Sequence, residues 1–125
     1  MINEGLTYRN MLRVSETSTA AYIGSGDIEV LATPALAALM ENAAMMAVAA
    51  ELPEGSTTVG TRLELNHSRA SAVGVEVTAE AVLTAVDGRR LTFRIEARDA
   101  QGLVGDCIHE RVIVDRQRFM AKIGK

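Results

Sequence analysis

The amino-acid sequence predicts a single α+β domain, residues 1–125, in which an antiparallel five-stranded sheet wraps around one long central helix. One apolar, alanine-rich helical segment and a run of strand-like segments after it support this. A single helix cannot bury itself and an antiparallel sheet has one face to cover, so packing the two together satisfies both. The chain has 125 residues, 48% hydrophobic and 23% charged, which is the length and composition of one folded domain.

The first predicted elements are a strand and the central helix. Residues 14–23 mix Thr, Ser, Ala and Tyr in a loosely extended pattern, which predicts the first strand. Thr33 followed by Pro34 predicts a helix start, because the threonine hydroxyl can cap free N–H groups and a proline there loses no hydrogen bond. Pro53 ends the helix near Glu51.

The helix composition indicates that it is buried. Eight of the sixteen residues from 35 to 50 are alanine, and the larger apolar side chains point in all directions. A helix that is apolar all round is typical of a buried one, and small side chains let a sheet or a second helix approach closely. Only Glu41 and Asn42 are polar in the middle of this segment.

The remainder of the chain predicts four strands and a short helical tail. The strand segments are rich in Val, Ile, Thr and Leu with partial alternation. Asp87-Gly88 favours a tight hairpin, and Asp99 to Gly102 serves the next reversal, so the last three strands form an antiparallel meander. The predicted strands are residues 57–67, 75–86, 91–99 and 103–114, and the tail is residues 116–123.

Composition excludes several function classes. The net charge of −3, aromatic content of 3% and absence of Trp argue against nucleic-acid binding. The single cysteine, Cys107, excludes an intrachain disulfide framework and a cysteine-rich zinc site. The apolar stretch is shorter than the roughly 20 residues of a membrane span, and residues 1–10 contain no signal-like apolar run. We therefore expect a cytoplasmic protein that binds no metal, membrane or nucleic acid.

Few residues could carry chemistry. Burying the carboxylate of Glu41 costs several kcal/mol unless it is paired or protonated, so it is either a nucleophile or general base in a partly dry cleft or a member of a structural ion pair. Its candidate ion-pair partners are Arg62, Arg94 and Arg111.

The two histidines are the other candidates. Strict alternation places His67 on the apolar face of its strand and Gly60 on the opposite face. A histidine on an apolar face is more often structural than catalytic, and His109 is open to the same two interpretations. Gly60 indicates a bulge or a close approach of a ligand. Considered alone, Thr33 is explained fully as a helix cap.

Several separated motifs together resemble one family. They are Ala32-Thr33, Leu39-Met40-Glu41, Gly60-Thr61, His67 seven residues after that glycine, Gly88 to Leu91, and His109-Glu110-Arg111.

These motifs resemble the fluoroacetyl-CoA thioesterase family of hotdog-fold proteins. The resemblance implies hydrolysis of an acyl-CoA thioester to free acid and coenzyme A, which is part of the substrate, so no separate cofactor is implied. By position it implies catalytic roles for Thr33, Glu41 and His67, and substrate contacts for Gly60 and Arg111. Residues 22–31 contain no Phe, whereas the family's founding member has a Phe-rich lid that selects the fluorinated acyl group.

Spacing along the helix implies a homodimer. Eight residues of regular helix separate Thr33 from Glu41 by about 12 Å, too far to act on one substrate atom, whereas two antiparallel protomers could each supply one of them. Three alternatives remain open: a non-catalytic acyl-CoA-binding module, a dehydratase or hydratase using His67 and Asp106, and a structural dimer with Glu41 in an ion pair.

Overall fold

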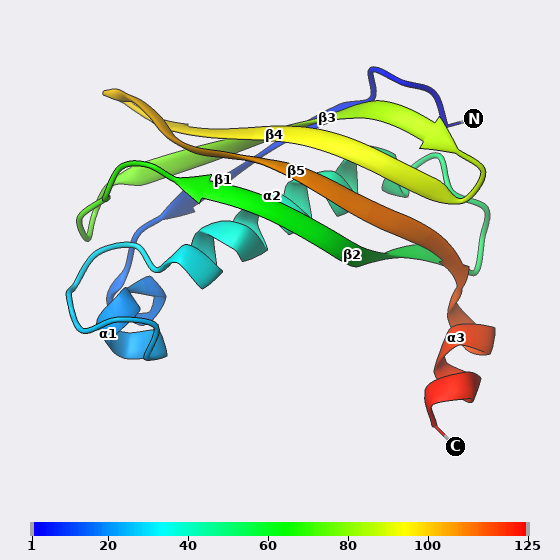
Figure 1. The fold of residues 1–125 in the computed structure, drawn as a ribbon, viewed down its shortest axis with the longest axis horizontal. Helices are drawn as coiled ribbons and strands as arrows, with labels where there is room; N and C mark the ends of the chain where they lie inside the picture. Colours follow the sequence, from blue (N-terminus) through cyan, green and yellow to red (C-terminus); the bar gives the residue numbers. More distant parts are fainter. Residues whose placement is uncertain (1, 125) are drawn as a thin grey trace.

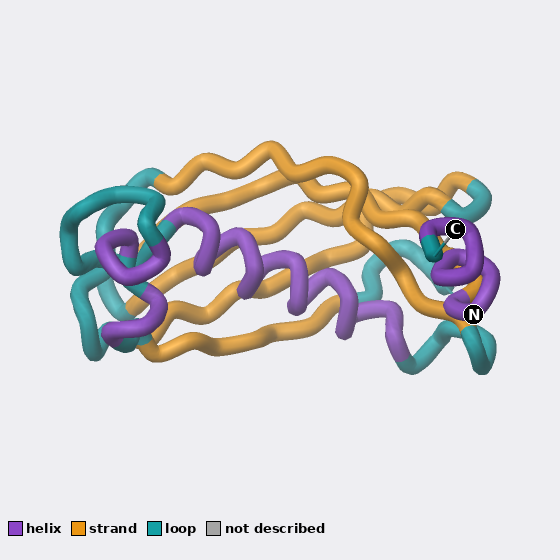
Figure 2. The backbone as a smooth tube through the Cα atoms, turned by 90° about the horizontal axis from the view of Figure 1, so that it is seen from below, coloured by secondary structure: helices purple, strands orange, loops and turns teal. Residues whose placement is uncertain are grey.

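The computed structural model describes residues 2–124 as one curled antiparallel sheet with a long helix against its concave face (Figure 1; Figure 2). Its elements in chain order are β1 (Thr7–Arg13), η1 (Glu16–Ser18), α1 (Ala20–Ile23), α2 (Thr33–Ala49), β2 (Ser56–His67), β3 (Glu76–Asp87), β4 (Arg90–Asp99), β5 (Gly102–Asp115) and α3 (Arg116–Ile123).

The five strands run in the order β1-β3-β4-β5-β2, every neighbouring pair antiparallel. The chain thus has the predicted α+β architecture of a five-stranded sheet curled around a central helix. β2 is an edge strand, paired with β5 on one side only. Helix α2 packs chiefly against β1 and β3, which leaves the inner surface of β2 less covered.

The core lies between α2 and the concave face of the sheet. Alternate residues of β3 and β4 point inward and are buried, as expected for strands with one covered face. The helix contributes its large apolar residues and three of its alanines to this core, namely Leu36, Leu39, Met40, Ala43, Ala44, Ala47 and Val48.

The predicted first strand is wrong. Residues 14–23 form the turn η1 and the short helix α1, and the first strand lies earlier, at Thr7–Arg13. Thr19 caps α1 through its hydroxyl, which accepts from the Tyr22 N–H. Local capping by Ser and Thr therefore outweighs the extended pattern in this segment.

The remaining elements agree with the sequence to within a few residues, and both hairpins are present. In the first hairpin Asp87 pairs with Arg90, so the two loop residues are Gly88 and Arg89, one position later than expected. Gly88 has φ of 59°, a left-handed conformation that glycine adopts without strain.

A β-bulge in β2 corrects the predicted alternation. Gly60 pairs with Arg111 and Arg62 pairs with Glu110, so Thr61 is an extra residue. The inserted residue turns Gly60 onto the same inner face as His67, whereas strict alternation had put them on opposite faces. The bulge therefore places both residues on the side of the sheet that faces α2.

One side of α2 is uncovered in the single chain. Pro34, Ala38, Met46 and Ala49 are exposed along it, so one chain alone does not cover every side of a helix whose composition indicates burial against a sheet or a second helix. Within residues 2–124, no helix is long and apolar enough to cross a bilayer.

Candidate active site

Thr33 and His67 meet at the N-terminal end of α2. Thr33 is the first helical residue and His67 is the last residue of β2, and Thr33 Oγ1 lies 2.8 Å from His67 Nδ1. The predicted cap role of Thr33 is wrong, because the N-cap is Ala32 and it makes no side-chain capping bond. The Thr33 hydroxyl is therefore free to bond to the imidazole.

The ring of His67 is half-buried. Burial lowers its pKa below the ordinary 6.5, and the nearby backbone of Arg69 offsets part of that effect. His67 is thus neutral near pH 7, and its Nδ1 can accept a proton from Thr33. Its Nε2 is buried and makes no hydrogen bond within the part of the chain that the structure describes.

A small cavity of about 310 Å³ lies beside this pair. Thr33 and His67 both line it, together with residues of α1, the segment before α2 and the turn after β2. These other lining residues are Ala20, Ser25, Val30, Leu31, Ser68, Arg69 and Ala70.

Glu41 belongs to a second group of residues, two helical turns farther along α2. A Cβ added to Gly60 would lie 2.9 Å from Glu41 Oε2, 3.2 Å from His109 Cε1 and 3.4 Å from Arg111 Nη1. The three side chains therefore converge on the space left by the missing side chain of Gly60. A larger residue there would displace the Glu41 carboxylate.

Arg111 is held firmly in this group. Its Nε donates to Thr58 Oγ1 at 2.8 Å, its Nη2 donates to the Thr58 carbonyl at 2.9 Å, and Nη1 lies 3.2 Å from His109 Nε2. Burial lowers the pKa of Arg111, an effect that the charge of Glu41 opposes. Arg111 thus provides a fixed positive charge near Glu41.

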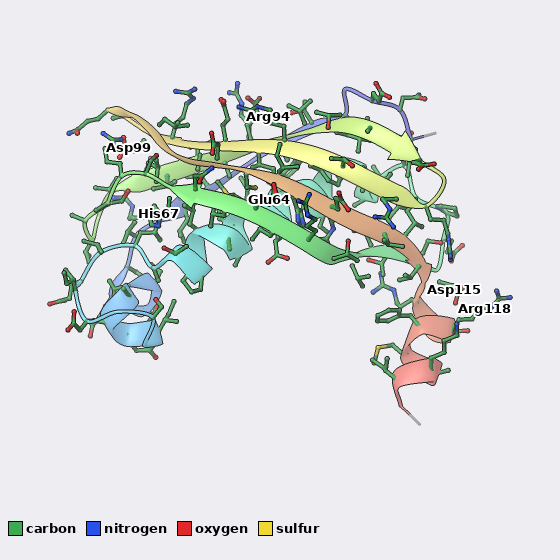
Figure 3. All side chains as sticks on the ribbon, viewed as in Figure 1. Glu64, His67, Arg94, Asp99, Asp115 and Arg118 are labelled. Atoms are coloured by element: carbon green, nitrogen blue, oxygen red, sulfur yellow. The ribbon has the colours of Figure 1, made fainter. Side chains whose placement is uncertain are left out.

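Glu41 is not in an ion pair. The pairs found across residues 2–124 do not include it, since Arg62 pairs with Glu64 and Glu110 while Arg94 pairs with Glu96. Arg94 lies on the convex side of the sheet, away from α2 (Figure 3). Arg62 and Arg94 are therefore not the partners of Glu41, and Arg111 acts on Glu41 as a nearby charge without forming an ion pair with it.

The two groups are separate within one protomer. Helix α2 is unbroken from Thr33 to Ala49, so Thr33 and Glu41 are about 12 Å apart along its axis. His67 lies at the α1 end of the sheet, far from α3 with Asp115 and Arg118 (Figure 3). One chain therefore brings together Thr33 with His67, and Glu41 with Gly60 and Arg111, but does not join the two groups.

Other candidate groups have little chemistry to offer. Asp106 pairs with Asn66 and bonds to its side chain at 3.3 Å, so it lies on the opposite face of the sheet from His67. A dehydratase pair of these two residues is thus not formed. Burial, with the nearby charges of Asp106 and Glu41, raises the pKa of the Cys107 thiol to about 12, so it stays protonated. Among the described residues, no three or more His, Cys, Asp or Glu side chains are grouped to hold a metal ion.

The sequence did not predict the contacts of Thr58 and His109. Both are buried polar residues that hold Arg111. The i, i+2 spacing of His109 and Arg111 placed them on one strand face, but only the strand register of β2 and β5 brings Thr58 alongside.

A five-stranded antiparallel sheet curled around one long helix is the hotdog fold of the thioesterases to which this chain is similar. Solved structures of the same fold include a hot-dog-like protein from Thermanaerovibrio acidaminovorans, with 27% identity and TM-score 0.88, covering 96% of this chain and 89% of that one. A thioesterase superfamily member from Thermus thermophilus has 26% identity and TM-score 0.90, covering 98% of this chain and 91% of its own.

The chain belongs to the fluoroacetyl-CoA-specific thioesterase family, whose model matches residues 14–117. The fluoroacetyl-CoA thioesterase of Streptantibioticus cattleyicolor is 38% identical over 95 residues, which is 76% of this chain and 68% of that protein. A solved structure of a fluoroacetyl-CoA-specific thioesterase has 30% identity and TM-score 0.91, covering 98% of this chain and 96% of that one. The resemblance drawn from separated motifs is thus confirmed at the level of family, fold and enzyme class.

Proposed function

We propose that this enzyme hydrolyses the thioester of a small acyl-CoA to the free acid and coenzyme A, with Thr33, Glu41 and His67 as its catalytic residues. The observation that carries this proposal is the 2.8 Å contact between Thr33 Oγ1 and His67 Nδ1 beside a small cavity. Family membership supports a thioester substrate, and a solved relative is described in complex with acetyl-CoA.

Two routes fit the residues. In the first, Glu41 either attacks the thioester carbonyl, giving an anhydride that water then hydrolyses, or removes a proton from a water that attacks the carbonyl directly. The thiolate leaves, and neutral His67 takes up the proton released from water and passes it to the thiolate. In the second, Thr33 attacks while His67 Nδ1 takes its proton and passes it to the departing thiolate, giving an acyl-enzyme that water then hydrolyses with neutral His67 as the base. In both routes the free N–H groups at the start of α2 stabilise the oxyanion.

Gly60 and Arg111 serve the substrate. Gly60 has no side chain to obstruct a thioester that approaches Glu41, whereas even one added carbon would come within 2.9 Å of Glu41 Oε2. Arg111 has two N–H groups beyond the three that bond to Thr58 and His109, and these can donate to a carbonyl or a phosphate oxygen.

A homodimer would complete the site. Each chain separates Glu41 from Thr33 by about 12 Å, and each has a free β2 edge and an exposed apolar stripe on α2 that includes Ala38 and Met46. An antiparallel pairing of two α2 helices would cover both stripes and bring the partner's mid-helix carboxylate toward Thr33 and His67. The proposed dimer has two such shared sites.

The acyl group would be small, in line with the family match and with a solved relative in complex with acetyl-CoA, and it would enter the cavity of about 310 Å³ beside Thr33 and His67. No Phe occurs in the segment from residue 22 to residue 31, so selection for a fluorinated acyl group through an aromatic lid is not proposed. For location we retain the cytoplasmic expectation, which rests on the cysteine usage.

The test is release of free thiol from short, branched, aromatic and halogenated acyl-CoAs. We expect wild type to hydrolyse at least one small acyl-CoA, Glu41→Gln and His67→Ala to lose most of that activity, and the exposed Glu64→Gln control on β2 to retain it. If wild type binds acyl-CoA without hydrolysing any, the chain is a binding module. If both site variants stay active, the residue assignment is wrong.

A further inference from the structure

His109 is a buried polar residue to which neither catalytic route assigns a task. It is 1% exposed, on β5, two residues before Arg111. We propose that His109 is a positioning residue, which holds the guanidinium of Arg111 beside Glu41 while keeping the two from forming an ion pair. This inference rests on the proposed function of Glu41 and Arg111.

The two neighbours of its ring determine where His109 carries its proton. His109 Nδ1 lies 2.7 Å from the carbonyl oxygen of Arg62, which can only accept, so Nδ1 must donate. His109 Nε2 lies 3.2 Å from Arg111 Nη1, which can only donate, so Nε2 must accept. His109 is therefore neutral with its proton on Nδ1, in agreement with the lowering of its pKa by burial and by the charge of Arg111.

The acceptor on Nε2 fixes the tilt of the planar Arg111 guanidinium about its two bonds to Thr58. Thr58 binds Nε and Nη2, which leaves Nη1 anchored only by His109. The carboxylate of Glu41 is a competing acceptor close by, because Glu41 Oε2 and Arg111 Nη1 lie 2.9 Å and 3.4 Å from the same point above Gly60. Without the acceptor of His109, the whole guanidinium would tilt about its bonds to Thr58 and bring Nη1 to Glu41, forming an ion pair with the carboxylate that the reaction needs.

A purely structural role is the competing explanation. The Arg62 carbonyl that His109 bonds to lies directly after the β2 bulge, so His109 could serve only to anchor that bulge. The two roles use different ring nitrogens, and this allows them to be separated by substitution.

Two variants each preserve one of the two bonds. His109→Gln places an amide oxygen near the position of Nε2, so it retains an acceptor for Arg111 and loses the donor to Arg62. His109→Asn places an amide N–H near the position of Nδ1, so it retains the bond to Arg62 and loses the acceptor. We expect kcat on a small acyl-CoA to be about tenfold lower in His109→Asn than in His109→Gln, with KM changing less.

The opposite ranking, or equal kcat values in the two variants, would overturn the positioning role. A melting temperature measured for each variant separates loss of folded protein from loss of rate. Long-range ¹H–¹⁵N spectra of the wild-type imidazoles provide a second readout, in which a His109 proton on Nε2 at pH 7 also overturns the proposal.

Hydrogen exchange of the Arg111 N–H protons, measured by NMR, tests the positioning role independently of thioester hydrolysis. If wild type hydrolyses no thioester, the proposed function fails. The positioning role then stands if slow exchange of the Arg111 Nη1 protons is kept in His109→Gln and lost in His109→Asn, and it falls if the two variants exchange alike.

Discussion

Replacing Gly60 with alanine tests whether the position of the Glu41 carboxylate matters for turnover. The added Cβ would lie 2.9 Å from Glu41 Oε2, roughly half an ångström closer than an ordinary contact. Because Glu41 Oε2 is the end of a flexible side chain, the carboxylate will move rather than the strand. A 1 Å misplacement of a reacting group can cost about 100-fold in rate, so this smaller shift should lower kcat roughly tenfold.

Stability should change little in Gly60→Ala. Overpacking typically costs about 1–3 kcal/mol, and the cost here should lie at the lower end, because rotation of Glu41 relieves the shortest contact and leaves the 3.2 Å contact with His109 Cε1. Replacing glycine with alanine also lowers the conformational entropy of the unfolded chain, which stabilises the folded protein by about 0.4–1 kcal/mol. The free energy of unfolding should therefore stay within about 1 kcal/mol of wild type.

Gly105→Ala is the matched control. Its added Cβ would lie 2.6 Å from the backbone oxygen of Asn66, which cannot move without disturbing the pairing of β2 with β5. We expect Gly105→Ala to lose about 2 kcal/mol or more of stability in urea unfolding. A Gly60→Ala variant with wild-type kcat in the thiol-release assay would refute the reasoning about Glu41.

Three further predictions follow from the pKa shifts. Burial raises the Asp99 pKa, but hydrogen bonds from the Gln101 N–H and from Arg69, with the Arg69 charge, lower it below 3.8 overall. The Asp99 carboxylate should stabilise the protein fully above pH 3.8 and less as the pH falls through its folded-state pKa. The difference in urea unfolding midpoint between wild type and Asp99→Asn should therefore narrow in acid, and a constant difference would contradict this. Burial lowers the pKa of His67, so protonation of His67 should reduce kcat/KM in acid with a midpoint below pH 6.5. A midpoint above pH 6.5 would contradict this prediction. The raised pKa of Cys107 predicts no alkylation by iodoacetamide in native protein at pH 8 and rapid alkylation in urea; rapid native alkylation, read by mass spectrometry, would count against it.

Sequence patterns predicted the architecture well where the period of the apolar residues is regular. The alanine-rich helix, the three meander strands and both hairpins appear close to their expected positions. The misassigned strand at residues 14–23 contains Ser and Thr residues whose side chains cap a 3-10 turn and a short helix. Such capping depends on single hydrogen bonds, which cannot be predicted from the alternation of apolar and polar residues along the sequence.

Site geometry was harder to predict than site composition. Thr33, Glu41, His67, Gly60 and Arg111 could be named from a family resemblance, but the bulge at Thr61 reversed the predicted face of Gly60. Thr58 could not have been found, because it reaches Arg111 only through strand pairing between residues 53 positions apart. Register across a sheet is set by the whole fold and by the position of bulges, not by local pattern.

Complementation between inactive variants is the most direct test of the shared site. Co-expressed Glu41→Gln and His67→Ala chains would form heterodimers in which one site retains His67 of one chain and Glu41 of its partner. Random pairing makes half of the dimers mixed, each with one of its two sites intact, so the account predicts about a quarter of wild-type activity from two inactive parents. A mixture no more active than the separate variants would contradict it.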